Sequence, residues 1–219
     1  FLLTICILSI SYYHLSIGYI MSGDSKSYSE WADILIKLNF NLYNYYSQNT
    51  FINPNYIYTI PVLVIALLKI LFGAEWQMAF LYFNLTLIIF SIIIFTKCLL
   101  LLKVRPLIIS FAFPMLALSV DLLIWPRYML TDMIFSFLVL LLILIMIKDI
   151  VNKELSYFSL LLMIITIYLT RPTSLPIIFA IISFIGLTKI IYNSKFIIKF
   201  IFILILFVPF IFATIFQLM

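Results

Sequence analysis

The chain has 219 residues, of which 66% are hydrophobic and 10% are charged, and its formal net charge is +5. Soluble domains have about 45–50% apolar and about 25% charged residues, so a water-soluble fold could not cover this much apolar surface. The composition excludes a soluble domain and indicates a membrane protein whose apolar side chains face lipid. In such a protein Lys and Arg mark cytoplasmic loops, so we expect no nucleic-acid partner.

Eight apolar stretches follow one another along the chain. Their long runs of Ile, Leu and Phe do not alternate with polar residues, which indicates helices and not barrel strands. Most can be extended to the roughly 20 residues that a spanning helix needs. The sequence therefore predicts an all-α, polytopic bundle of about seven spans. The stretches are 1–21, 57–72, 78–102, 106–125, 133–147, 157–169, 173–191 and 197–216.

The first stretch begins at Phe1 without a Met, and the last one runs almost to the C-terminus. We therefore expect 1–219 to be a single transmembrane domain and a fragment of a longer chain. Cys6, Cys98 and His14 lie inside apolar stretches, far from any second metal ligand or partner thiol. We interpret all three as packing residues.

The loop after the first stretch contains an amphipathic helix. From Tyr28 to Leu38, the residues Trp31, Ile34 and Leu35 recur at helical spacing among charged residues. This pattern is typical of a helix lying on a membrane surface. Further tyrosines supply an interfacial aromatic belt. They are Tyr43, Tyr45, Tyr46, Tyr56 and Tyr58.

The stretch 57–72 is the weakest candidate span, because it is short and contains Pro61 and Lys69. If it crosses the membrane, the loop 22–56 is cytoplasmic. If it lies in the interface, the same loop is external. Composition leaves both options open.

Basic residues indicate the orientation of the later spans. They cluster in three connections, which the positive-inside rule places in the cytoplasm. The connections contain Lys97, Lys103 and Arg105, then Lys148 and Lys153, then Lys189, Lys195 and Lys199. Ser119–Asp132 and Thr170–Ser174 then face outward. Asp149 and Glu154, in KDIVNKEL, are expected in a solvated cytoplasmic loop.

Two charged residues at the outer membrane boundary each have two interpretations. Asp132 either caps the helix that it opens, or meets Asp24 and Arg127 in an external cavity. Arg171, in YLTRPTSLP, either reaches the lipid headgroups or, beside exposed helix N-termini, binds a phosphate. The chain contains no P-loop, dinucleotide-binding or zinc-protease motif. An enzyme of this kind would need a substrate that lives in the membrane.

Several motifs in order resemble the N-terminal part of a GT-C-type membrane glycosyltransferase, of the family 39-like group that includes protein O-mannosyltransferases and aminoarabinose transferases. The first span is followed by GDSKSY and then by NPNYIYTIPVLVIALLKILFG. Two spans later come WPRYMLTD, entering another span, and then TRPTSLP. The resemblance covers nearly the whole chain and rests on the order of the motifs.

The resemblance implies a fold, a reaction and a site. Residues 22–77 would form the first external loop with its interfacial helices, and 78–219 the remaining transmembrane helices. The enzyme would transfer a hexose or pentose from a polyprenyl-phosphate donor to a lipid, glycan or protein acceptor. Asp24 would act as the base and Asp132 would line the same site, so 57–72 would not cross. Arg127 and Arg171 would bind the phosphate, with Tyr28 and Glu75 as further substrate-binding candidates.

A divalent metal is the one cofactor that the resemblance leaves open. The expected location is a bacterial inner membrane, with the site facing outward. The alternative interpretations are a transporter or flippase, and a non-catalytic membrane subunit of polysaccharide or cell-envelope assembly. Transporters tend to carry polar, broken helices near the bilayer midplane, whereas the polar residues here gather at helix ends.

Overall fold

The computed structural model describes residues 2–47, 58–117, 125–128, 131–152, 154–171 and 175–192. Within them every regular element is a helix, which confirms the expected all-α class for this part of the chain. The predicted stretch 197–216 lies outside these residues. The elements are α1 (Leu2–Ile17), α2 (Gly23–Lys37), α3 (Leu42–Ser47), α4 (Thr59–Phe72), η2 (Gly73–Glu75), α5 (Trp76–Leu101), α6 (Pro106–Ala117), η3 (Trp125–Arg127), α8 (Asp132–Asn152), α9 (Tyr157–Tyr168) and α10 (Leu175–Tyr192).

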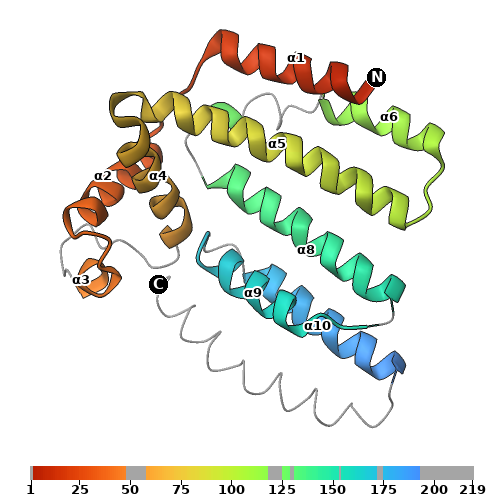
Figure 1. Ribbon diagram of the computed structural model, residues 1–219. Coiled ribbons are helices and arrows are strands. Elements are labelled where there is room, and N and C mark those ends of the chain that lie inside the picture. Colours follow the sequence, from red (N-terminus) through yellow and green to blue (C-terminus); the bar gives the residue numbers. More distant parts are fainter. Residues whose placement is uncertain are drawn as a thin grey trace.

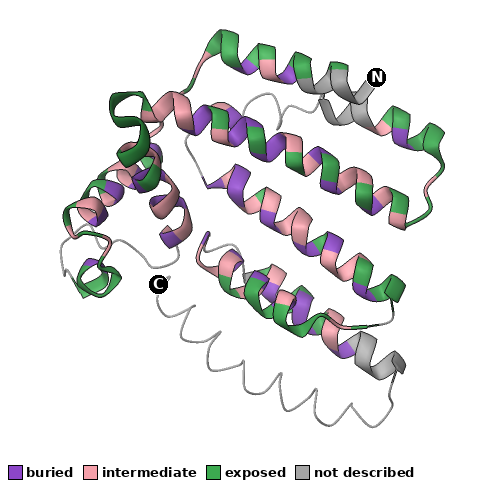
Figure 2. Ribbon diagram, viewed as in Figure 1, coloured by how far each residue is buried: buried purple, intermediate pink, exposed green. Residues whose placement is uncertain are grey.

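Most helices lie side by side, with α5 and α8 as neighbours at the centre (Figure 1). Helices α1 and α6 pair beside α5, and α9 and α10 lie beyond α8. Leu81, Leu85 and Ile88 of α5 belong to the same apolar core as Met133 and Leu138 of α8. Buried positions concentrate along α5, whereas much of the outer surface of α1 and α9 is exposed (Figure 2).

The two ends of this helical layer differ. At one end, which we call the cap end, α2, α3 and α4 lie beside the end of α1, the start of α8 and the end of α9 (Figure 1). At the other, which we call the turn end, the chain passes from α5 to α6 and from α8 to α9. Lys103 and Arg105 belong to the first of these connections. Since α5 has 26 residues, the two ends are about 39 Å apart along it.

Among the residues that the structure describes, two helical stretches are long and apolar enough to cross a membrane, namely Thr59–Leu101 and Asp132–Asn152. The first contains a turn at Gly73, whose φ is 53°, so α5 is the part of it that is long enough to cross. The 21 residues of α8 span about 32 Å, close to the roughly 30 Å of a hydrocarbon core. In contrast, α9 has 12 residues and ends in a turn at Leu169. The structure therefore does not extend the stretch 157–169 to full spanning length.

Both ends of α4 lie at the cap end. At its start, the Ile60 N–H donates to the Leu169 carbonyl just after α9, with a distance of 3.1 Å. Beyond its end, α5 begins beside η3, where the Asn84 amide donates to the Pro126 carbonyl at 2.9 Å. The 14 residues of α4 cover about 21 Å. The helix thus returns to the end from which it starts and packs on α2.

The amphipathic helix of the first loop is longer than the sequence pattern indicates. It begins at Gly23 because Ser22 and Ser25 form a capping box, in which each side chain accepts from the other's backbone N–H. Asp24 therefore lies in the first helical turn. The buried face consists of Ser25, Tyr28, Ala32 and Leu35, so it is turned relative to the predicted stripe. The short helix α3 was not expected either, and it buries Tyr45, which was assigned to the aromatic belt.

The expectation that Asp149 lies in a solvated loop is wrong. Helix α8 continues to Asn152, and Asp149 is only 4% exposed. Its carboxylate accepts from the Ser156 backbone N–H at 3.0 Å and from the Ser156 hydroxyl at 2.6 Å. These bonds compensate the burial of the charge and hold the start of α9 against the end of α8. Glu154 is exposed, as expected.

Candidate functional site

Arg171 and Asp132 form an ion pair at the cap end. The Arg171 guanidinium donates to the Asp132 carboxylate, joining the end of α9 to the first residue of α8. The two side chains are 33% and 26% exposed, so the pair is partly shielded from water but still accessible. The guanidinium also lies 5.9 Å from the centre of the Phe135 ring. Of its five N–H donors, those not used by Asp132 can bind an anion.

A pair of tyrosines lies beside this ion pair. The Tyr28 and Tyr58 rings are 5.3 Å apart. Burial raises the pKa of the Tyr28 hydroxyl, Tyr58 and Asp24 raise it further, and Arg171 acts in the opposite sense. Burial likewise raises the pKa of Tyr58, where Arg171 again lowers it and Asp24 again raises it. Both charges are therefore within electrostatic reach of both phenols.

Two backbone arrangements bring these groups together. The capping box at Ser22 fixes the start of α2, which carries Asp24 and, one turn later, Tyr28. The bond from Ile60 to Leu169 holds the start of α4, next to Tyr58, against the segment that leads to Arg171. We call Asp24, Tyr28, Tyr58, Asp132 and Arg171 the polar cluster. Its members come from four separate parts of the chain.

Arg127 contacts the segment between α1 and α2. Its Nε donates to the Gly18 carbonyl at 3.0 Å, and its own carbonyl accepts from the Ile20 N–H at 2.8 Å. Gly18 has a φ of 79°, a conformation in which a glycine is favoured. Arg127 thus fastens η3 to the segment between α1 and α2. Asp132, which was expected to meet Arg127, forms its ion pair with Arg171.

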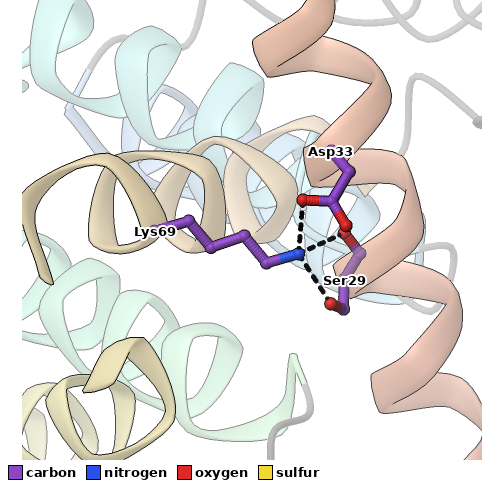
Figure 3. A network of polar contacts seen from close by, with 3 residues as sticks. All are labelled: Ser29, Asp33 and Lys69. Atoms are coloured by element: carbon purple, nitrogen blue, oxygen red, sulfur yellow. Dashed lines mark hydrogen bonds and ion pairs between the residues drawn. The ribbon is translucent and has the colours of Figure 1, made fainter. Parts of the chain in front are cut away.

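Lys69 connects α2 to α4, as Figure 3 shows. Its ammonium donates to the Ser29 carbonyl at 2.8 Å, to the Ser29 hydroxyl at 2.7 Å and to the Asp33 carboxylate at 2.7 Å. It also lies 4.9 Å from the centre of the Trp76 ring. At 100° per residue, Ser29 and Asp33 lie on the opposite flank of the buried face of α2 from Asp24. This clamp therefore restricts rotation of α2 about its axis, on which the position of Asp24 depends.

Glu75 lies apart from the polar cluster, in the exposed turn between α4 and α5. It lines a pocket of about 480 Å³ together with residues of the last turn of α4 and one face of α5. In the described ranges, no three His, Cys, Asp or Glu side chains are grouped as a metal site. The polar cluster contains two carboxylates that could serve as metal ligands, those of Asp24 and Asp132.

Sequence reasoning named four of the five residues in the polar cluster. Tyr58 was assigned to the aromatic belt. Its place in the cluster depends on a contact between α4 and the end of α9, which are far apart in the sequence, so a local sequence pattern could not reveal it. Lys69 was noted only as a charge that weakens a candidate span. Its partners Ser29 and Asp33 are four residues apart on α2, which is the spacing of one helical face. Pro172, Thr173 and Ser174, which follow Arg171 in the chain, lie outside the described residues.

Comparison with known proteins gave no family model, no curated relative and no solved structure that matches this chain.

Proposed function

We propose that the chain is part of a membrane glycosyltransferase that transfers a sugar from a polyprenyl-phosphate donor to an acceptor at the extracytoplasmic face. The observation that carries the proposal is the polar cluster. It combines a carboxylate that can serve as base, Asp24, with a partly exposed guanidinium, Arg171, around one pair of tyrosines. The resemblance to GT-C enzymes in the order of the motifs adds the substrate class.

The proposed reaction assigns one role to each charged group. The acceptor's hydroxyl or other nucleophile attacks the anomeric carbon of the sugar, and its proton passes to the Asp24 carboxylate. The bond from that carbon to the phosphate oxygen breaks, and the polyprenyl phosphate leaves. Negative charge then develops on the leaving phosphate, which Arg171 stabilises with its free N–H donors. Asp132 holds the guanidinium in place, and Tyr28 and Tyr58 offer neutral hydroxyls to the substrate.

The proposed membrane arrangement has about seven spans, with α2, α3 and α4 at the outer surface. Helices α5 and α8 have the length and apolarity that spanning requires. The two charged groups of the ion pair lie at the start of α8 and just after α9, where they can reach an aqueous boundary. A substrate with a lipid tail and a charged head meets the protein at such a boundary.

The placement of buried polar residues favours an enzyme over the transporter alternative. Transporters build their sites from broken helices near the bilayer midplane. In the described ranges, the buried polar residues other than Asn84 lie within about four residues of a helix end. These residues are His14, Ser25, Thr59, Thr131, Asp149 and Thr170.

The test is sugar transfer by the full-length protein in proteoliposomes with a polyprenyl-phosphate sugar donor. We expect Asp24→Asn to lower the rate at least about 100-fold, since general bases contribute about 10²–10⁴-fold. Glu30→Gln is the matched control, because it removes an exposed carboxylate from the same helix, outside the polar cluster. Undiminished transfer by Asp24→Asn would remove Asp24 from the catalytic role.

A further inference from the structure

The pocket between α4 and α5 has the form of a groove that follows one helix face. Its residues on and before α5 recur every three or four positions, which places them in one stripe. From Glu75 to Thr86 this stripe covers about 16 Å, close to half of the roughly 30 Å hydrocarbon thickness. Leu68 and Phe72 of α4 form its other wall. The stripe on α5 consists of Met78, Ala79, Tyr82, Phe83 and Thr86.

The groove has one charged residue, and that residue lies at its cap end. Glu75 is exposed, and within the described chain no hydrogen bond or ion pair of its carboxylate is found. The neighbouring cation, Lys69, already uses its ammonium on Ser29 and Asp33. The Glu75 carboxylate is thus available to an external cation.

Two of the apolar side chains that line the groove are largely exposed. Phe72 is 52% exposed and Tyr82 is 53% exposed. A water-soluble ligand would leave these side chains in water, whereas a lipid chain would cover them. The groove therefore fits an amphiphile that has an apolar chain alongside α5 and a positively charged group at Glu75.

We propose that this groove binds a bilayer phospholipid with a primary-ammonium head group, such as phosphatidylethanolamine. The ammonium donates hydrogen bonds to the Glu75 carboxylate, and one acyl chain lies along the stripe from Met78 to Thr86. Glu75 disfavours anionic lipids, so the groove is distinct from the proposed phosphate-binding position at Arg171. The proposal goes beyond sugar transfer and does not require it.

Native mass spectrometry of the purified full chain tests the proposal. The protein is incubated with equal amounts of phosphatidylethanolamine, phosphatidylcholine and phosphatidylglycerol that carry identical acyl chains. We expect phosphatidylethanolamine to be retained about two- to fivefold over each of the others, the range of an exposed ion pair. A trimethylated ammonium cannot donate, and a glycerol head group has no cation. Equal retention of the three lipids, or preference for phosphatidylglycerol, overturns the proposal.

Two variants locate the binding. Glu75→Gln should abolish the preference while some lipid is still retained, and Ala79→Phe, which fills the groove, should reduce retention of all three lipids. Glu30→Gln, an exposed carboxylate on α2, is the control and should leave the preference unchanged. A preference that survives Glu75→Gln places the lipid elsewhere and rejects the groove. Because no sugar donor is used, this outcome is independent of the Asp24→Asn transfer assay.

Discussion

The Arg171–Asp132 pair joins two helices that sequence reasoning treated separately. Each side chain is about a quarter to a third exposed, so water screens part of the attraction. We expect Arg171→Met and Asp132→Asn each to lower the free energy of unfolding, because each leaves one partly buried charge without its partner. In the double variant the losses should not add, and the coupling free energy should be about 1 kcal/mol.

Denaturant unfolding in detergent micelles measures all four proteins of this cycle. Additive losses would show that the two side chains contribute independently. Because we propose that Arg171 also binds the substrate phosphate, Arg171→Lys should lower the rate of sugar transfer. A lysine keeps the charge but lacks the planar fork that binds a carboxylate and a phosphate together.

Lys69 is a second residue whose charge is compensated inside the protein. Its side chain is 12% exposed, whereas that of Asp33 is 53% exposed. Lys69→Met should lower the free energy of unfolding by about 1–3 kcal/mol, because Ser29 loses its partner as well. Asp33→Asn should lower it by less than about 1 kcal/mol, because Lys69 keeps both bonds to Ser29. Thermal or denaturant unfolding in micelles gives both values.

The control for the clamp is Lys37→Met, which removes an exposed positive charge from α2, the helix that Lys69 contacts. Equal losses for Lys37→Met and Lys69→Met would show that positive charge near α2 matters, and not the three bonds of the clamp. Lys69→Arg is the informative conservative change. An arginine can keep donors near Asp33 and Ser29, so it should recover part of the stability lost in Lys69→Met.

The tyrosines of the polar cluster predict a dependence of stability on pH. Burial raises the pKa of Tyr28 and Tyr58 above the ordinary value near 10. The stability that their neutral forms contribute is fully present below pH 10 and is lost as the pH rises through the raised pKa values. Between pH 7 and 9 these groups should therefore leave the stability unchanged. Above pH 10, Tyr28→Phe should flatten the loss of stability, and an identical slope in the two proteins would contradict this assignment.

At the scale of elements, the sequence predicts the apolar helices well and their ends poorly. Uninterrupted apolar runs correspond to α5 and α8 within about five residues. An apolar run of that length usually forms one long helix, so its presence is easy to predict. The start of α2 was missed because it depends on reciprocal bonds between Ser22 and Ser25 in a polar segment. The burial of Asp149 was missed because its compensating partner, Ser156, is a single hydroxyl residue in the following connection.

Helix α4 is the element on which the interpretation of the first loop depends. Its sequence fits both a short span and an interfacial helix, and the choice comes from a contact with Leu169, more than 100 positions away. We expect cysteines introduced as Asn44→Cys and Ala74→Cys, which flank α4, to react with an impermeant thiol reagent from the same side of the membrane. The background variant is Cys6→Ser/Cys98→Ser. Labelling from opposite sides would show that α4 crosses.

At the scale of the whole molecule, the distribution of Lys and Arg differs between the two ends of the helical layer. Of the 13 Lys and Arg residues, eight lie in or beside the three connections already described, and five lie in the segments assigned to the outside. Of those five, Lys69 and Arg171 are paired with carboxylates and Arg127 with a carbonyl. Under the positive-inside rule, we propose that the turn end lies in the cytoplasm and that the cap end, with the polar cluster, faces outward.

This orientation predicts a difference in labelling between two exposed carboxylate positions. In the same cysteine-free background, Glu30→Cys on α2 should react with an impermeant thiol reagent in intact bacterial cells. Glu154→Cys, in the connection from α8 to α9, should react only after the membrane is permeabilised. The reverse pattern would place Asp24 and Arg171 in the cytoplasm. A lipid-linked sugar presented at the outer face could then not reach them, and the glycosyltransferase proposal would fail at the level of topology, whatever the chemistry of the cluster.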